Sequence, residues 1–340
     1  MELQSPSACN YMAARQPQNW RRLMQFGLSI PHRGPLANPE AIRAIAENAE
    51  ASGYGVLSMA DHIVVPRTIN SRYPYSPDGG WAGGADGACF EQISLLNYVA
   101  GITRQARLLT SIMVIPHREP IFTAKALATA DQLSGGRVEL GIGTGWMREE
   151  FELLKTPPFK ERGAVTDEYI QVFKTLWTEE NPSFDGDYVQ FKDIFFQPKP
   201  IQSGGPKIWV GGESGRALRR LAALGDVWYP IAGGNPKAPL DTLSAYDAAL
   251  AKLREAAEKA DRDPATITLA YNAMGHSDRD RASATGERML MTGSAAARQD
   301  DAAALAERGV ATMVVNVAAG ALDKALAKQN AFAEDVMSAF

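Results

Sequence analysis

RVELGIGTGWMREEF, residues 137–151, joins a short apolar run typical of a strand to three glycines in five positions and then to the start of a helix. The glycines do not complete the G-x-G-x-x-G of a dinucleotide-binding turn, because Trp146 takes the last glycine position. Glycines at this point leave room for a flat ring or a phosphate against the backbone. The alternative is a glycine kink that fits the taper of a barrel.

The same order, a strand pattern followed by a helical pattern, repeats from Gln25 to the end of the chain. The predicted strands are residues 26–31, 54–60, 107–115, 137–143, 207–212, 226–231, 267–274 and 311–317. In residues 39–52, Ile42, Ile45 and Ala49 share one helix face, as expected for a helix that packs on a sheet. Eight strands alternating with helices predict a closed (β/α)8 TIM barrel rather than a doubly wound open sheet, which usually has fewer strands.

We expect residues 25–340 to form one barrel domain and residues 1–24 to be a poorly ordered extension or a start-codon artefact. Two connections, residues 63–88 and 179–206, are longer than usual and are predicted to be inserted segments over the barrel mouth or its rim. Within the second, SFDGDYVQF predicts a β-hairpin that turns at Asp185 and Gly186.

Composition excludes several classes of protein. A net charge of -4 without a basic stripe argues against a nucleic-acid partner. The two cysteines, Cys9 and Cys89, are too far apart to indicate a disulfide framework or a thiolate zinc site. No apolar run reaches the roughly 18 residues of a membrane span, and the first residues lack a signal-peptide core. We therefore expect a cytoplasmic protein with no membrane partner.

The chain has four histidines, and each follows the end of a predicted strand. In (β/α)8 barrels these strand ends carry the functional site. His62 emerges from an apolar strand with Asp61 beside it, which predicts a catalytic or cofactor-contacting pair. His32, His117 and His276 are predicted to line the substrate pocket, with packing of loops as the alternative. None is paired at the spacing of metal ligands, so no metal site is expected.

A second glycine stretch, IWVGGESGRALRRL, covers residues 208–221. It predicts a strand, a turn with Gly212, and a helix that begins with Ser214 as its N-cap and with Gly215 and Arg216 in its first turn. A helix N-terminus of this kind binds phosphate through free backbone N–H groups, here with a hydroxyl and a positive charge added. Plain capping is the alternative. A sugar-phosphate barrel would carry this site after its last two strands, where the chain has no glycine-rich turn.

These stretches resemble the bacterial luciferase-like superfamily, whose members use reduced FMN or the deazaflavin coenzyme F-420. The resemblance covers most of residues 24–232 and is strongest in DQLSGGRVELGIGTGW. It implies a cofactor ring in the barrel mouth beside Asp61 and His62. It also implies a bulge of the third strand, often with a non-proline cis peptide, under the ring. The implied contacts are Ser111 and Ile112 at the bulge; Gly143, Thr144 and Gly145 along the ribityl chain; and Gly212, Ser214 and Gly215 at the phosphate.

The resemblance implies an oxidoreductase, most simply a monooxygenase that uses reduced FMN and O2 to oxidise a small organic substrate. Hydride transfer with the deazaflavin coenzyme F-420 stays open, as does a non-catalytic flavin-binding barrel. His62 is the predicted proton donor, oriented by Asp61. Trp146, Trp228 and Tyr229 are predicted to shape an apolar substrate pocket, with core packing as the alternative. A separate flavin or deazaflavin reductase and a homodimer or higher homo-oligomer are the expected partners.

Overall fold

Short apolar runs form the strands of a closed parallel barrel. The computed structural model describes residues 24–76, 78–81, 83, 87–232, 239–316 and 319–340. Within them the barrel strands are β1 Gln25–Ser29, β2 Val56–Met59, β3 Arg107–Thr110, β5 Val138–Gly143, β8 Ile208–Gly211, β9 Val227–Tyr229, β10 Thr268–Ala273 and β11 Val310–Val315. Strand β1 pairs in parallel with β11, and β3 pairs in parallel with β5, so the ring closes. The predicted (β/α)8 barrel and its eight strands in the described residues are confirmed.

The third predicted strand is split in two. Strand β3 ends at Thr110, and the short strand β4, Met113–Val114, continues it and pairs with β5. Between them lies a cis peptide bond from Ser111 to Ile112, neither of which is proline. The expected bulge with a non-proline cis peptide is therefore present at the barrel mouth.

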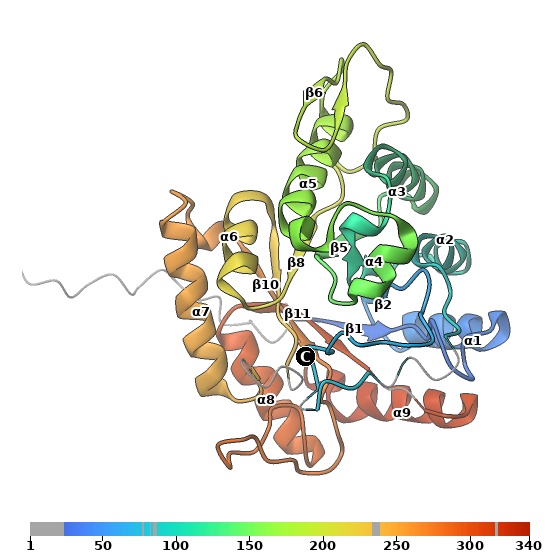
Figure 1. Cartoon of the computed structure of the whole chain (residues 1–340). Coiled ribbons are helices and arrows are strands. Elements are labelled where there is room, and N and C mark those ends of the chain that lie inside the picture. The colour runs from blue at the N-terminus through green and yellow to red at the C-terminus, as the bar shows by residue number, and fades with distance from the viewer. Residues whose placement is uncertain (1–23, 77, 82, 84–86, 233–238, 317–318) are drawn as a thin grey trace, which may run out of the picture.

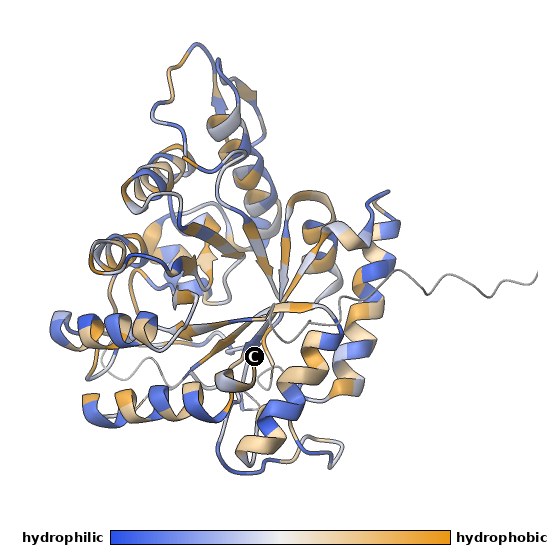
Figure 2. Ribbon diagram, turned by 180° about the vertical axis from the view of Figure 1, so that it is seen from behind, coloured by the Kyte–Doolittle hydropathy of each residue, from blue (hydrophilic) through white to orange (hydrophobic). Residues whose placement is uncertain are grey.

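The helices surround the barrel (Figure 1). Those described are α1 Pro39–Ala51, α2 Gln92–Ile102, α3 Pro120–Ser134, α4 Arg148–Leu154, α5 Arg162–Thr178, α6 Gly215–Leu224, α7 Leu243–Glu258, α8 Ala295–Glu307 and α9 Leu322–Asp335. Helix α1 begins where Asn38 accepts a hydrogen bond from Ala41 N at 2.9 Å, and it buries Ile42, Ile45 and Ala49 as predicted. Figure 2 shows mostly hydrophobic strands inside helices with mixed faces. No described helix is long and apolar enough to cross a membrane.

Side chains inside the barrel form layers, because alternate residues of each strand point inward. An apolar layer contains Val56, Leu109, Trp209, Val227, Ala270 and Val314. Two residues further along their strands come Ser58, Ser111, Tyr229 and Asn272, nearer the carboxyl ends. The upper layer of the barrel interior is therefore polar, and it lies toward the mouth.

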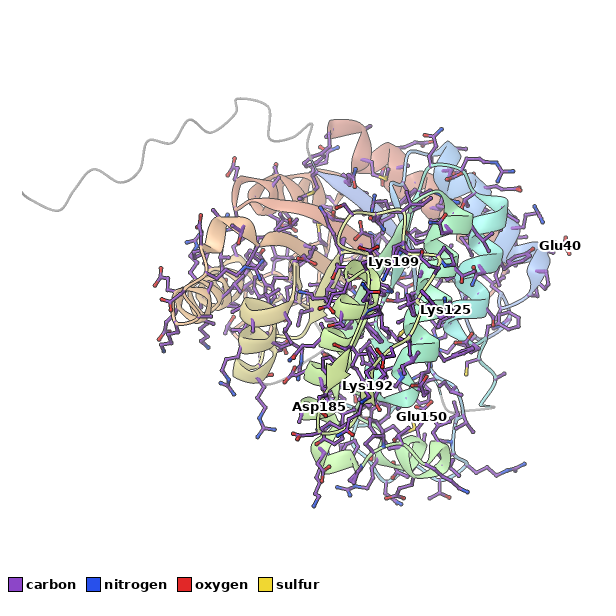
Figure 3. All side chains as sticks on the ribbon, turned by 90° about the horizontal axis from the view of Figure 1, so that it is seen from above. Glu40, Lys125, Glu150, Asp185, Lys192 and Lys199 are labelled. Carbon is purple, nitrogen blue, oxygen red and sulfur yellow. The ribbon has the colours of Figure 1, made fainter. Side chains whose placement is uncertain are left out.

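The two inserted segments differ in position. Residues of the 63–88 segment lie over the mouth, where Glu149 of α4 accepts hydrogen bonds from Asn70 N at 2.7 Å and Ser71 N at 3.0 Å. The second segment contains the hairpin β6 Phe184–Asp185 and β7 Gln190–Phe191. Its labelled residues Asp185 and Lys192 lie toward the same end of the molecule as Glu150 (Figure 3). The hairpin is thus at the rim, beside α5.

The hairpin turn differs from the prediction. Asp185 pairs with Gln190, and Gly186 N donates to Val189 O at 2.9 Å, so the chain reverses at Asp187 and Tyr188 rather than at Asp185 and Gly186. The physical reason is Glu168 of α5, whose carboxylate accepts hydrogen bonds from three successive backbone N–H groups, those of residues 187, 188 and 189. At the other end of the chain, Met24 is buried against the core, and the expectation for residues 1–23 lies outside the described residues.

Candidate functional site

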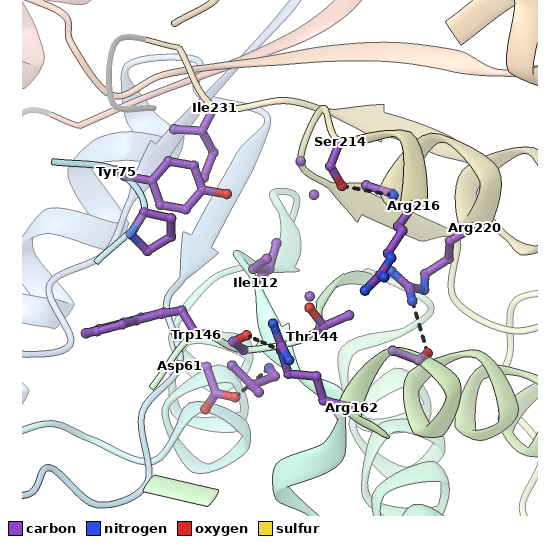
Figure 4. Close-up of a pocket in the computed structure, with 18 of the residues that line it drawn as sticks. Asp61, Tyr75, Ile112, Thr144, Trp146, Arg162, Ser214, Arg216, Arg220 and Ile231 are labelled. Carbon is purple, nitrogen blue, oxygen red and sulfur yellow. Dashed lines mark hydrogen bonds between the residues drawn. The ribbon is translucent and has the colours of Figure 1, made fainter. Parts of the chain in front are cut away.

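A cavity of about 1060 Å³ opens at the carboxyl ends of the barrel strands. This volume is at the upper end of what small-molecule sites occupy. In Figure 4, Ser214 and Arg216 lie on one side of Ile112, and Trp146 and Tyr75 lie on the other. The cavity therefore has a cationic end and an aromatic end, with the Ser111–Ile112 bulge between them.

The glycines of the opening stretch make room for the bulge. A Cβ atom at Gly141 would meet the carbonyl oxygen of Thr110, and a Cβ at Gly143 would meet the side chain of Ile112. Gly145 has φ of +79°, and a Cβ there would come within 2.7 Å of Phe151 and Val114. Gly143, Thr144 and Gly145 still line the cavity. The packing alternative is thus correct for Gly141, and the space that Gly143 leaves is filled by Ile112 rather than by a ligand.

The cationic end is built on the N-terminus of α6. Ser214 caps this helix by accepting a hydrogen bond from Ala217 N at 3.3 Å, as predicted. Gly212, Ser214 and Arg216 line the cavity, whereas Gly215 lines a separate groove between α6 and α7. Arg216 is exposed and makes no ion pair among the residues that the structure describes. Free N–H groups, a hydroxyl and an unpaired guanidinium together suit a phosphate.

Two more arginines surround this helix end, and neither was singled out from the sequence. Arg162, the first residue of α5, donates from Nε to Gly145 O at 3.1 Å. Arg220, one turn after Arg216, pairs with Asp167 and donates to Gly163 O at 3.0 Å. Burial lowers the pKa of Arg162, and the positive charge of Arg216 lowers it further. Because the cations are crowded together, an anion bound between them would be stabilised.

His62 and Glu150 form a pair in the cavity wall. Glu150 lies in the first turn of α4, and its buried carboxylate accepts from His62 Nδ1 at 2.9 Å and from the backbone N–H of Ile63 at 2.8 Å. Burial acts to raise the pKa of Glu150, but the hydrogen bond from His62 and the nearby histidine charges outweigh it and hold that pKa below its usual range. An ionised carboxylate only accepts, so His62 carries a proton on Nδ1 and keeps Nε2 for other partners.

Asp61 does not orient His62, which corrects the sequence-based expectation. Its carboxylate accepts from both terminal nitrogens of Arg118 at 2.8 Å and from Val114 N at 2.9 Å. Burial would raise the pKa of Asp61, but the hydrogen bonds and charge of Arg118 hold it below the ordinary value. Asp61, which follows β2, therefore holds β4 through Val114 and the segment after it through Arg118, and the contact with His62 that was expected of Asp61 is made by Glu150.

The aromatic end is formed largely by the 63–88 segment. Trp146 contacts Tyr73 with ring centroids 5.1 Å apart and Trp81 with centroids 5.8 Å apart. Trp81 also packs on the ring of His62 at 4.4 Å. Trp146 lines the cavity as predicted, together with Tyr75 and Ile231. These surfaces suit a small apolar molecule.

The other three predicted histidines separate. His32 lines the cavity, and burial followed by the charge of Arg33 lowers its pKa to about 4. His117 is buried behind the wall, with its ring 4.7 Å from that of Phe151. His276 lies away from the cavity, where Arg298 Nη1 is 3.1 Å from its Nε2. Contrary to the expectation, His117 and His276 are not among the residues that line this cavity, because His117 packs beside Phe151 of α4 and His276 packs between Arg298 of α8 and Phe332 of α9.

Two predicted aromatic residues also lie outside the cavity. Trp228 is fully buried between the barrel and α7, with its ring 5.5 Å from that of Tyr246. Tyr229 points into the barrel, where its hydroxyl is 3.1 Å from Ser111 Oγ and accepts from Asn272 Nδ2 at 3.0 Å. Adjacent strand residues face opposite sides, so both cannot face one pocket. Core packing is the correct alternative for Trp228, and Tyr229 supports the cavity floor from beneath.

Sequence reasoning missed several residues that line or support the site. They are Arg33, Tyr73, Tyr75, Trp81, Arg118, Glu150 as the partner of His62, Arg162 and Arg220. The aromatic residues had a signal, since RYPY and GGW are unusual in an exposed loop. Glu150 lies in the helix that follows the glycine turn, but only the fold brings it to His62, 88 positions away.

The donor set suits an organic anion better than a metal ion. Within the described ranges, no group of three His, Cys, Asp or Glu side chains is placed to hold a metal. The helix N-terminus and the arginines fit a phosphate, and the bulge with its apolar Ile112 fits the face of a flat ring. The residues present therefore fit a flavin-type cofactor.

Comparison with known proteins agrees with this fit. A family model described as luciferase-like monooxygenase matches residues 24–335. An uncharacterized protein of Mycobacterium tuberculosis is 35% identical over 216 residues, which are 63% of this chain and 72% of that protein. An FMNH2-dependent dimethylsulfone monooxygenase of Pseudomonas putida is 34% identical over 164 residues, which are 47% of this chain and 45% of that enzyme.

Solved structures share the fold. A monooxygenase from Streptomyces bottropensis superposes with a TM-score of 0.70 at 19% identity, over 93% of this chain and 99% of that one. An F-420-dependent secondary alcohol dehydrogenase, solved with an F-420–acetone adduct, gives a TM-score of 0.69 at 17% identity and the same coverage of both chains.

Proposed function

Since the chain belongs to the luciferase-like monooxygenase family, we propose that it is an oxidoreductase that holds a reduced flavin-type cofactor in the barrel mouth. The observation that carries the proposal is that one cavity combines a helix N-terminus with arginines that suit a phosphate, a bulge floor and an aromatic end. When bound, the cofactor supplies the electrons, either to activate O2 for monooxygenation or as a hydride. The residues of the chain bind, orient and shield it.

Reduced FMN is the first candidate cofactor. The similarity to an FMNH2-dependent monooxygenase over 164 residues supports it. The second candidate is coenzyme F-420, which one feature favours: Lys160 and Arg219 line the cavity beyond the helix N-terminus. These outer cations would accept an anionic tail longer than a single phosphate.

His62 is the proposed proton-transfer residue. Its Nδ1–H is held by Glu150, so its Nε2 is the atom available to give or take a proton in the cavity. Tyr73, Tyr75 and Trp81 would exclude water and bind a small apolar substrate. A separate reductase that supplies reduced cofactor, a homo-oligomeric state and a cytoplasmic location remain part of the proposal.

Titration with FMN and with F-420, followed by ring absorbance, tests the binding claim. We expect micromolar binding of at least one of them, and failure of both would refute the proposal. The double variant S214A/R216A should weaken the affinity at least about 10-fold, the loss expected when a charge-assisted anion contact is removed. The matched control is S294A, which removes the same capping bond, Ala297 N to Ser294 Oγ at 3.2 Å, from helix α8 outside the cavity. Unchanged affinity in S214A/R216A would move the phosphate elsewhere.

Turnover separates the enzyme from a non-catalytic binding barrel. An enzyme consumes reduced cofactor faster when a suitable small organic compound is added. Tight binding with no substrate-dependent consumption across a panel of sulfones, alkanes and aromatic compounds would favour the binding protein instead.

A further inference from the structure

Three polar side chains of the upper barrel layer connect the cavity floor to the barrel interior. Ser111 lines the cavity and is half-buried, and Tyr229 beneath it is 1% exposed. The Tyr229 hydroxyl is 3.1 Å from Ser111 Oγ and 3.0 Å from Asn272 Nδ2. The three residues come from separate parts of the chain, on the bulge after β3, on β9 and on β10.

The chemistry of these groups sets the direction in which the hydrogen bonds run from Asn272 through Tyr229 to Ser111. An amide nitrogen only donates, so Asn272 gives a proton to the oxygen of Tyr229. The single proton of the Tyr229 hydroxyl is then left for Ser111 Oγ. Ser111 accepts from below, and its own hydroxyl proton is directed away from Tyr229, on the side of the cavity.

Two other buried tyrosines have different hydrogen-bond partners. Tyr271 donates to Leu240 O at 2.8 Å, and Tyr54 donates to Gln329 O at 2.9 Å. In both, a backbone carbonyl that can only accept ends the chain. Tyr229 is held instead by a donor, and Ser111 Oγ is the neighbouring oxygen that can take its proton. Packing alone does not require this arrangement.

We propose that Tyr229 and Asn272 are positioning residues that fix the Ser111 hydroxyl as a hydrogen-bond donor into the cavity. With a flavin-type cofactor bound, this donor would meet a ring nitrogen or ring carbonyl. Only the identity of that acceptor rests on the proposed function. The orientation of the hydroxyl is a property of the chain itself.

Binding spectra test the contact with the ring. A donor removed from a flavin ring displaces its absorption bands, so S111A should displace the spectrum of bound FMN or F-420. Y229F leaves the Ser111 hydroxyl without its orienting partner and should displace the spectrum in the same direction, by no more than S111A does. Each should weaken binding about 2- to 10-fold, the range for loss of one hydrogen bond. The double variant should be no weaker than S111A, because Tyr229 acts only through the Ser111 hydroxyl. Y271F is the control: it removes an equally buried hydroxyl on the neighbouring strand and should leave the spectrum unchanged.

A variant that reverses the direction of these hydrogen bonds is a sharper test. In N272D, measured at pH 8, the carboxylate only accepts, so Tyr229 must donate to residue 272 and Ser111 to Tyr229. We expect the spectrum of S111A, although the serine is still present. A spectrum like that of the wild type in N272D or in Y229F, or independent effects of S111A and Y229F, would overturn the proposal.

A measurement without cofactor separates this inference from the proposed function. In protein labelled with 15N-asparagine, the side-chain amide resonance of Asn272 should move in Y229F and stay in place in Y271F. If it does not move, the orientation is wrong whether or not a cofactor binds. If it moves but neither cofactor binds, the orientation stands, whereas the proposed function and the ring acceptor fall together.

Discussion

Replacement of Asp61 by asparagine should destabilise the protein strongly, although the sequence placed this residue among the catalytic ones. Its carboxylate side chain is 0% exposed, and that of Arg118 is 9% exposed. Two hydrogen bonds of 2.8 Å join the pair, and a third, of 2.9 Å, comes from Val114 N. An asparagine keeps one acceptor oxygen for these three donors and turns an N–H₂ group toward a guanidinium.

The magnitude follows from burial of the guanidinium. Removal of one member of a buried ion pair costs about 3–5 kcal/mol, because the other charge is left without compensation. Arg118 keeps a hydrogen bond of 2.8 Å to Glu91, whose side chain is 38% exposed. Because that partner remains, D61N should lower the free energy of unfolding by an amount at the lower end of this range, about 3 kcal/mol.

Urea unfolding followed by tryptophan fluorescence measures this loss. The control is D247N, since Asp247 also forms a two-bond pair with an arginine, Arg308, but at the surface, with side chains 49% and 27% exposed. An exposed pair contributes about 0–1 kcal/mol. If D61N and D247N lose the same free energy of unfolding, the buried pair has been misjudged.

The pH dependence of D61N has a definite sign. The pKa of Asp61 is lowered in the folded state, so the carboxylate stabilises the fold above its unfolded pKa of about 3.9. This stabilisation is lost as the pH falls through the lower, folded pKa. The difference between wild type and D61N should therefore be constant from about pH 5 to 8 and should shrink below about pH 4.

Three further predictions concern the site and its surroundings. E150Q keeps an oxygen for the backbone N–H groups of the 63–88 segment but removes the carboxylate from His62. We expect kcat to fall about 100-fold, with the cofactor Kd within about 2-fold of wild type. A larger change in Kd than in kcat would contradict the pairing of Glu150 with His62. G145A should lower the free energy of unfolding by more than about 1 kcal/mol in a urea titration, because Gly145 has φ of +79° and the new Cβ would meet Phe151. An unchanged free energy of unfolding would mean that the turn relaxes to accept the methyl group. Burial lowers the pKa of His276 to about 4, so between about pH 6.5 and 4 the unfolded state binds a proton that the native state does not. As the pH falls through this range, the wild type should lose up to about 3 kcal/mol of its free energy of unfolding, and H276N should retain it.

Strand and helix positions were readable because each depends on a local pattern. The apolar runs and amphipathic repeats predicted the barrel strands and the surrounding helices, and Ser214 was recognisable as an N-cap from its place before a helical run. The split of residues 107–115 was not visible in the strand pattern, because apolar residues continue on both sides of Thr110 and Ser111; only the family resemblance indicated the Ser111–Ile112 bulge. The hairpin turn was misplaced because Glu168, from another element, holds its backbone.

The hydrogen-bond partners of the site residues could not be predicted from the local sequence. Asp61 and His62 are adjacent in the sequence, yet the backbone directs them to different partners, Arg118 and Glu150. Trp228 and Tyr229 are adjacent on a strand, so one faces the helices and the other the barrel interior.

By itself, the sequence determined the (β/α)8 barrel, the position of the candidate site at its mouth and the helix end that suits a phosphate, because periodicity, strand ends and caps are local properties of the chain. Only the tertiary structure decided which charges pair, which aromatic residues face the cavity and what the glycines of RVELGIGTGWMREEF make room for. The physical reason is that hydrogen bonds and steric contacts act over a few ångströms in space. Residues such as His62 and Glu150, 88 positions apart, come within that distance only when the barrel has closed.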